Sequence, residues 1–198
     1  MNTDVPPRAL QRSDAQRNRA RIMAAARQMF TEPPVEPSTA GAPSRDLSMA
    51  EVARRAGVGR ATLYRNFPDR RDLLEALFAD EVEDLIAAAA PTEDPGKALV
   101  DWLRRFAAFE DSKRVIAKEL LEYTSPTDPI FGGSRQRVIA AGEPLMTAAQ
   151  AAGHIRADVT LVQALDLVLA VARLDRPPDQ IRTILQVALD GLRPSHNR

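Results

Sequence analysis

Residues 48–67 constrain the fold of this chain most tightly, because they predict two short helices joined by a glycine turn. Ser48 precedes the apolar positions of "MAEVARRA", and Glu51 follows at the spacing of a capping box, which places the helix start at Met49. Gly57 stands where a left-handed C-cap would end that helix, and "GRATLYRNF" then resumes helical spacing. This is the pattern of a helix-turn-helix, whose second helix enters the major groove of DNA while the first braces it.

The rest of the chain is also predicted to be helical, since no part of it alternates as a half-buried strand does. One helix is expected from about Asp14 to Phe30, and another over "DRRDLLEALFADEVEDLIAAAA". After the break at "PTEDPG" we expect four or five more, in the segments "KALVDWLRRFAAFED", "SKRVIAKELLEYT", "SRQRVIAAGEPLMTAAQAAG", "DVTLVQALDLVLAVARL" and "PDQIRTILQVALDGLR". Residues 1–13 are expected to form a flexible basic arm and the proline-rich residues 31–47 a long loop. The predicted fold class is all-α.

Charge is divided unevenly along a chain that is neutral overall. Residues 1–72 hold 13 arginines against 8 acidic residues, a net charge of +5, whereas residues 73–198 hold 14 basic against 19 acidic residues, a net charge of −5. A basic first third joined to an acidic remainder indicates that the first third contacts a polyanion. Taken alone, the charge count fits solvated surface arginines equally well.

Several classes of protein are disfavoured by what the sequence lacks. It has no apolar run of about 18 residues, no secretory signal at its start and no cysteine, so we expect a cytoplasmic protein without a membrane partner. Its two histidines form no metal-ligand spacing with acidic residues, and no glycine-rich phosphate loop follows a strand. We therefore expect no catalytic residues, no metal and no cofactor, and the chain is not predicted to be an enzyme.

The segments "RARIMAAARQMF" and "LSMAEVARRAGVGRATLYRNFPDRRDLLEALF" resemble the DNA-binding domain of the TetR family of bacterial transcriptional regulators. About 30 consecutive positions of the second segment follow the family's pattern. "AAQAAGHIRADVT" and "ALDGLR" resemble an actinobacterial-looking branch of that family. The resemblance implies a homodimer of nine to ten helices, with a three-helix DNA-binding domain over residues 14–72 and a helical effector-binding and dimerisation domain over residues 73–198. It further implies a repressor that a small-molecule effector releases from a palindromic, inverted-repeat operator in double-stranded DNA.

Arg60 begins the second helix of the motif, where an arginine can make the bidentate contact to guanine. Arg70 begins the next helix and is suited to a phosphate contact. It stands where the family frequently has lysine, which keeps the charge. A second departure from the family is the loop of residues 31–47, which is roughly ten residues longer than usual. It could lie along the DNA, but it is expected to be inert, because loops tolerate insertion at little cost. The positions that match the family's DNA-contacting residues are Ser48, Met49, Arg60, Ala61, Thr62, Tyr64, Arg65, Asn66 and Arg70.

An aromatic stripe on one helix suggests either core packing or a ligand pocket, and core packing is the commoner outcome of such spacing. The family resemblance adds the alternative that some of these rings line an effector pocket. The candidate pocket residues are Trp102, Phe106, Phe109, Leu120, Tyr123, Leu145 and Met146. Glu119 or Glu122 could orient a polar group of such a ligand, but both are expected on a solvated face.

Residues 159–172 are apolar on nearly every side, and the last helix carries a regular apolar stripe. We expect these two helices to pair with their copies in a second subunit, the alternative being the core of a monomer. The candidate interface residues are Leu161, Leu165, Val168, Ile181, Ile184, Leu185, Ala188 and Leu189.

Two other functions remain open at this point. The chain could be a helical scaffold that binds a protein partner through its acidic part, with DNA binding secondary or lost. It could also be a regulator that has no effector. A steep fall of DNA affinity with salt would separate a regulator from a scaffold, and a ligand-induced gain in stability would identify an effector.

Overall fold

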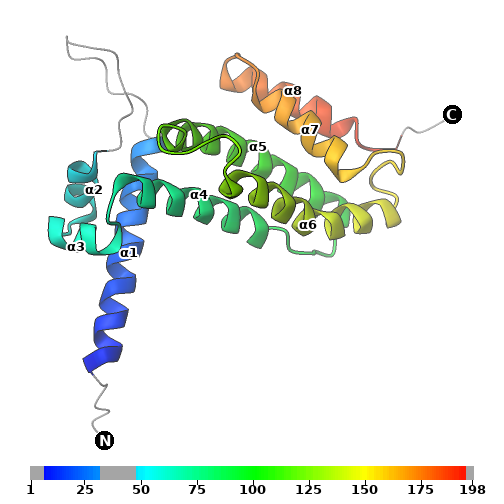
Figure 1. Ribbon diagram of the computed structural model, residues 1–198. Coiled ribbons are helices and arrows are strands. Elements are labelled where there is room, and N and C mark those ends of the chain that lie inside the picture. The colour runs from blue at the N-terminus through cyan, green and yellow to red at the C-terminus, as the bar shows by residue number, and fades with distance from the viewer. Residues whose placement is uncertain (1–6, 32–47, 195–198) are drawn as a thin grey trace, which may run out of the picture. The chain divides into compact units, whose positions relative to one another are not determined.

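Eight helices and no strands occur in residues 7–31 and 48–194, which are the residues that the computed structural model describes (Figure 1). The prediction of an all-α chain is confirmed, although the count is slightly below nine to ten. The helices are α1 (Pro7–Thr31), α2 (Met49–Ala56), α3 (Arg60–Asn66), α4 (Arg70–Ala87), α5 (Pro95–Leu120), α6 (Pro129–Ala151), α7 (Leu161–Ala172) and α8 (Pro178–Asp190).

Helix α5 accounts for the lower count, because it is a single helix of 26 residues where the sequence predicts two. The predicted break lies between Asp111 and Ser112, but no proline or glycine stands from Lys97 to Leu120. Without such a breaker the intrahelical hydrogen bonds continue through the polar residues at this point.

Helix α1 also differs from the prediction, since it begins at Pro7 and not at about Asp14. Proline suits the first helical position, because its fixed φ is helical and the missing N–H has no partner there in any case. The remainder of the predicted arm, residues 1–6, and the predicted proline-rich loop from residue 32 to residue 47 lie outside the described residues.

The contacts within the chain define two units. The first comprises Met1–Leu77 together with Lys118–Tyr123, and the second comprises Phe78–Ala117 together with Thr124–Arg198. Helices α4 and α5 each belong to both units, because α4 crosses the boundary after Leu77 and α5 crosses it after Ala117.

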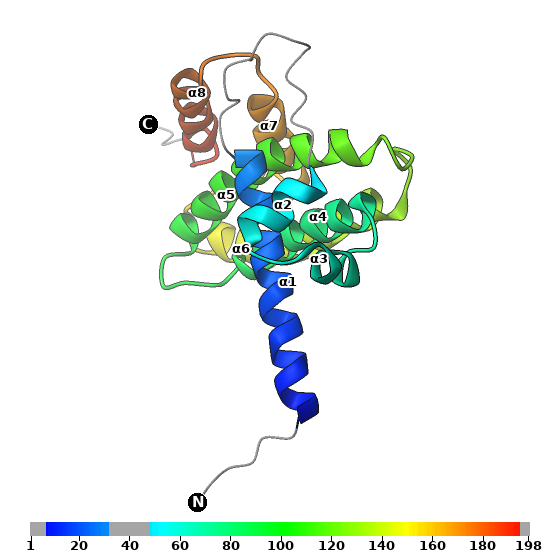
Figure 2. The ribbon, with the colours of Figure 1, turned by 90° about the vertical axis from the view of Figure 1, so that its left-hand side faces the viewer.

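In the first unit, α2 and α3 lie against α1 (Figure 2). Ile22 of α1, Val52 of α2 and Leu63 of α3 are fully buried, so each helix contributes apolar surface to one small core. Two arginines of α1 hold the turns of the motif. Arg21 donates a hydrogen bond to the carbonyl of Gly57 at 3.0 Å, and the guanidinium of Arg19 lies 4.4 Å from the centre of the Phe67 ring.

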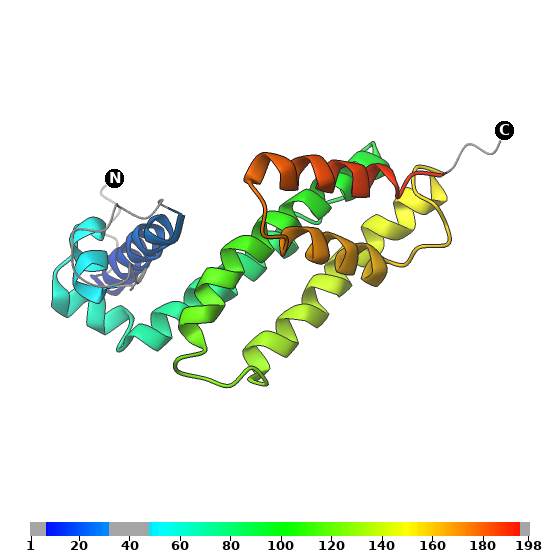
Figure 3. The same cartoon turned by 90° about the horizontal axis from the view of Figure 1, so that it is seen from above.

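In the second unit, α7 packs against both α6 and α8 (Figure 3). Trp102 of α5 is almost fully buried, and its indole N–H donates a hydrogen bond to the carbonyl of Leu85 at 3.0 Å. Gly142 of α6 approaches the six-membered ring of this indole so closely that a Cβ atom there would lie 2.6 Å from Cζ3 of Trp102. Close packing of α6 against α5 therefore depends on the missing side chain.

Replacing Gly142 by alanine is expected to lower the free energy of unfolding by about 1–3 kcal/mol, because the added methyl group overpacks the Trp102 contact. Urea denaturation measures the change. Gly132→Ala, in the same helix, is the matched control, since nothing lies within 4 Å of its Cβ position. We expect the control to gain up to about 1 kcal/mol from helix propensity. Equal shifts in the two variants would contradict the packing argument.

Candidate functional site

Helix α2 has the two ends that its sequence predicts. Ser48 is the N-cap, and its hydroxyl accepts a hydrogen bond from the backbone N–H of Glu51 at 3.4 Å. Gly57 adopts a left-handed conformation with φ 61° and ψ 39°. Its N–H donates to the carbonyl of Arg54 at 3.1 Å, and the N–H of Val58 donates to the carbonyl of Ala53 at 3.0 Å, which is a Schellman motif. This turn sets the direction in which α3 leaves α2.

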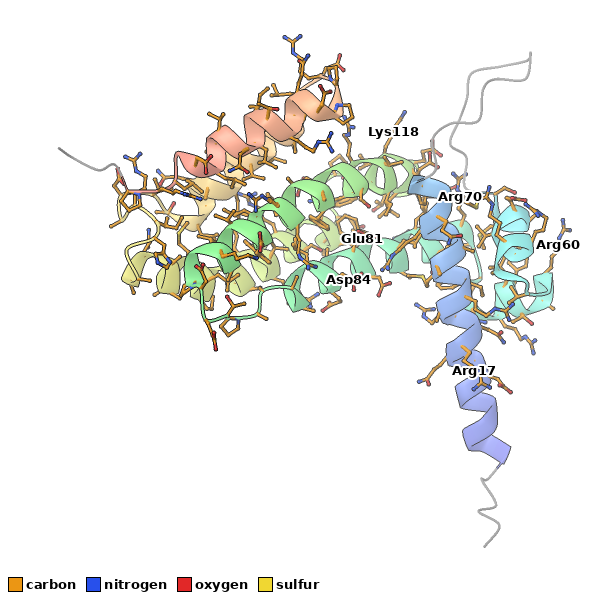
Figure 4. All side chains as sticks on the ribbon, turned by 180° about the vertical axis from the view of Figure 1, so that it is seen from behind. Arg17, Arg60, Arg70, Glu81, Asp84 and Lys118 are labelled. Carbon is orange, nitrogen blue, oxygen red and sulfur yellow. The ribbon has the colours of Figure 1, made fainter. Side chains whose placement is uncertain are left out.

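One side of α3 is anchored and the other is exposed. Leu63 is fully buried, whereas Arg60, Ala61, Tyr64 and Arg65 are exposed on the remaining surface of the helix. Figure 4 shows Arg60 on the side of the motif that faces away from α1. Since a short helix braced by two others can present its free face to a groove, this is the geometry that major-groove reading requires.

The arginines around the motif differ in whether an acidic side chain of the protein is paired with them. Glu51 pairs with Arg54 at 2.6 Å and with Arg55 at 2.8 Å. The hydrogen bond from Arg54, followed by that from Arg55, lowers the pKa of Glu51 from the ordinary 4.5 to about 2. By contrast, the guanidinium of Arg60 makes no hydrogen bond or ion pair within the part of the chain that the structure describes.

The other candidate DNA-contacting residues lie around this face. Arg65 donates hydrogen bonds to Thr62 Oγ1 and to the carbonyl of Ala61, each at 3.2 Å. Asn66 donates to the carbonyl of Thr62 at 2.8 Å, and both side chains are half-buried. Met49 is half-buried at the start of α2, beside the exposed Ser48. The motif thus brings eight of the nine candidates onto α2, α3 and their first cap.

Arg70, the ninth candidate, has a protein partner. Its guanidinium forms an ion pair with the carboxylate of Glu119, and the two side chains are 19% and 13% exposed. Glu119 is therefore not on a solvated face as the sequence suggested, whereas Glu122 is exposed. The continuation of α5 to Leu120 places Glu119 near its end, in the segment that belongs to the first unit.

A cavity of about 150 Å³ lies within the second unit. Of the seven candidate pocket residues, Phe106 and Phe109 line it. Trp102, Leu145 and Met146 are buried without lining this cavity, while Leu120 and Tyr123 belong to the first unit. The lining residues that the sequence analysis did not single out include Glu110, Lys113, Phe131, Arg135 and Arg173. Of these residues, only Glu110 and Lys113 could have been identified from sequence spacing, because they lie close to Phe109 on the same helix. The other three come from other parts of the chain.

The candidate interface residues of α7 and α8 fall into two groups. Leu161, Leu165, Val168 and Leu189 are buried within their own chain, and Ile181, Leu185 and Ala188 are half-buried. Ile184 is 39% exposed, and two residues that were not candidates are also exposed, namely Leu167 at 41% and Val187 at 69%. Val187 could have been identified from the sequence, because it follows the candidate Ile184 by three residues and so lies on the same side of α8.

Within residues 7–31 and 48–194, no helix has both the length and the apolar character of a membrane span. The same residues contain no cluster of three or more side chains that could hold a metal ion.

Two family profiles match the chain. The profile of the C-terminal domain of SbtR-like transcriptional regulators matches residues 94–194, and that of bacterial regulatory proteins of the tetR family matches residues 44–77. Among curated proteins, the uncharacterized HTH-type transcriptional regulator Rv2250c of Mycobacterium tuberculosis is 28% identical over 72% of this chain and 76% of its own length. The HTH-type transcriptional repressor LfrR of Mycolicibacterium smegmatis is 46% identical over 27% of this chain and 28% of its own length.

Two solved structures are similar over nearly the whole chain. The TetR transcriptional regulator SCO0520 of Streptomyces coelicolor has a TM-score of 0.69 and 35% identity, and the match covers 89% of this chain and 99% of that one. A TetR transcription regulatory protein of Mycobacterium vanbaalenii has a TM-score of 0.70 and 30% identity, over 93% of this chain and 99% of that one. The chain is therefore similar to these proteins in both units.

Proposed function

Because the chain belongs to the TetR family of bacterial transcriptional regulators, we propose that it is a homodimeric repressor that a small molecule releases from an inverted-repeat operator. DNA-binding regulation is the activity of this family, whose members are not enzymes. Residues 14–72 then bind DNA, residues 73–198 bind the effector and dimerise, and the protein acts in the cytoplasm. The repressor LfrR, which is similar over 27% of this chain, supports the assignment as a repressor.

The observation that carries the proposal is the state of Arg60. Its guanidinium lies on the exposed side of α3 and is not engaged by any described residue. We assign it a bidentate contact to guanine, which is the commonest specific contact in the major groove. The remaining eight candidates, from Ser48 to Arg70, then supply backbone and neighbouring base contacts.

The exposed apolar residues of α7 and α8 support dimerisation. Leu167, Ile184 and Val187 are all more than a third exposed, and a two-fold interface would bury the same patch on both subunits. Such a dimer presents two copies of α3 to half-sites about one helical turn apart.

Release by a ligand requires that the effector cavity and the DNA-binding motif are connected by helices that can move. Phe109 and Lys113 of α5 line the cavity, and Phe131, also in its wall, packs edge-on against Phe78 of α4 at 5.3 Å between ring centres. Both helices continue into the first unit, where Arg70 and Glu119 join their ends. A ligand that binds one arrangement of α4 and α5 more tightly than the other shifts the population towards it.

Selection from a random double-stranded DNA library, followed by sequencing of the bound fraction, tests the proposal. We expect an enriched inverted repeat, with affinity that falls steeply as salt rises. If a correctly folded dimer enriched no motif, the family would describe ancestry and fold alone, and a protein partner would become the better proposal.

The Arg70–Glu119 pair yields a separate prediction. If Arg70 exchanges the carboxylate for a DNA phosphate, Arg70→Gln will weaken binding to all sequences alike and reduce the slope of log affinity against log salt by about 0.9. Glu119→Gln should strengthen binding, because the guanidinium loses its ion pair with this carboxylate.

Salt titrations of both variants measure the two effects. The double variant Arg70→Gln/Glu119→Gln is the control for folding, since it leaves no charge unpaired at a site that is four-fifths buried. An unchanged salt slope in Arg70→Gln would show that Arg70 only ties α4 to α5.

A further inference from the structure

The residues that line the cavity among α5, α6 and α7 indicate which chemical class of ligand it can bind. Two larger hollows in the second unit, of about 440 and 790 Å³, are lined by no Phe, Tyr or Trp side chain. The cavity of about 150 Å³ is lined by Phe106, Phe109 and Phe131, with Val138 and Leu165 among the aliphatic residues. Among the residues that the structure describes, it therefore offers an aromatic surface that the other two hollows lack.

The size and shape of these walls suit a single ring. The cavity volume of about 150 Å³ is that of a site for one benzene-sized molecule. The rings of Phe106 and Phe109 lie 6.3 Å apart and are tilted by 34° to each other, on one side of α5. Phe131 comes from α6, and aromatic ligands gain from edge and offset contacts with such rings.

The residues that line the cavity include more positively than negatively charged side chains. Among the described residues, the cavity is lined by three cations, Lys113, Arg135 and Arg173, and by one carboxylate, Glu110. Lys113 lies 3.2 Å from Glu110 and also 5.3 Å from the centre of the Phe109 ring. Arg135 pairs with Asp166 at 3.2 Å. The side chain of Arg173 makes no hydrogen bond or ion pair with any residue that the structure describes.

This wall can therefore match an anion better than a neutral or cationic group. Glu110 already has Lys113 as its partner, whereas Arg173 offers a guanidinium fork that no carboxylate of the described residues occupies. Guanidinium groups bind carboxylates through two parallel hydrogen bonds, which are stronger than hydrogen bonds between neutral groups.

We infer that the effector is a small aromatic carboxylate, with its ring among the three phenylalanines and its carboxylate bound by Arg173 and Lys113. The inference rests on the ligand-released repressor proposed above and adds the chemical class of the ligand. It follows from the combination of a ring-sized aromatic cavity with an excess of cations at its wall.

Calorimetric titration of the full-length protein in the absence of DNA tests this inference. The probes are benzoate, phenylacetate and 3-phenylpropanoate, each compared with its own amide, and benzylamine as the cationic analogue. We expect at least one carboxylate to bind about tenfold or more tightly than its amide and than benzylamine. The inference is overturned if no carboxylate binds more tightly than its amide, or if benzylamine binds best.

Variants locate the site. Arg173→Gln is expected to weaken carboxylate binding about tenfold and to leave amide binding unchanged, and its fold should persist because Arg173 is exposed at the end of α7. Arg105→Gln is the matched control, since Arg105 is an exposed arginine of α5 that does not line the cavity. Equal carboxylate affinity in Arg173→Gln and in the unsubstituted protein would overturn the assignment.

Adding the selected operator in a second titration separates this inference from the proposed function. A carboxylate that binds with the expected selectivity but leaves the protein on its operator supports the ligand class and contradicts ligand release. Release by an amine or a neutral compound instead supports the repressor and overturns the carboxylate.

Discussion

Val187→Asp is expected to convert the dimer into monomers and to weaken binding to the full operator by about a hundredfold or more. Val187 is 69% exposed, the most of any large apolar residue in the described part of the chain, and it lies near Ile184 on one side of α8. A carboxylate at this position would be buried without a partner in the proposed interface, which is costly. Loss of the second subunit removes the second half-site contact, and linked binding sites gain about 10²–10⁴ in affinity.

Sedimentation equilibrium and binding to full and half operators measure these effects. Arg182→Asp is the control, because Arg182 is exposed on α8 about 140° around the helix from Val187. We expect the control to remain dimeric and Val187→Asp to bind half operators as the unsubstituted protein does. A dimeric Val187→Asp would move the interface away from this side of α8.

Arg60→Ala is expected to remove the preference for one base pair in each half-site. The bidentate contact that we assign to this guanidinium is worth about 1–3 kcal/mol of discrimination, or roughly 5- to 150-fold for each half-site. Thermal stability and dimerisation should not change, because the Arg60 side chain has no partner among the described residues whose loss would disturb the fold.

Repeating the DNA selection with the variant provides the measurement. Arg54→Ala is the matched arginine control within the same motif, since Arg54 is already paired with Glu51. Its binding motif should stay as in the unsubstituted protein. If Arg60→Ala also kept every position of the motif, another residue of α3 would have to read the base.

The features that could be predicted from the sequence are those that short segments determine by themselves. The cap at Ser48, the left-handed Gly57 and the start of α2 each depend on residues within one or two turns of helix. The exposed side of α3 follows from the single buried position, Leu63. For this reason the candidate DNA-contacting residues lie on the elements where the sequence places them, and only the ion pair of Arg70 with Glu119 was not expected.

The features that escaped prediction depend on residues far apart in the chain. The ion pair of Arg70 with Glu119 joins residues 49 positions apart and requires α5 to continue past the expected break. The cavity wall combines Phe109 of α5, Phe131 of α6 and Arg173, which caps the C-terminal end of α7. Periodicity tells which side of a helix is apolar, but it does not tell which side chain lies opposite.

The apolar helix α7 illustrates the same limit. Leu165 and Val168 are buried within their own chain, where α6 and α8 contact α7. The sequence pattern indicated burial on all sides, yet it could not distinguish cover by the same chain from cover by a second subunit.

Trp102 also gives the second unit a fluorescent probe of its own. It is the only tryptophan in the sequence, it is almost fully buried, and its ring stacks on Phe106 of the cavity wall at 6.4 Å. We therefore expect its fluorescence to report on folding of the second unit and, through Phe106, on occupation of the cavity. Melting of the three-helix motif is expected to leave the emission unchanged. Fluorescence and circular dichroism transitions that fail to coincide would show that the two units unfold in separate steps.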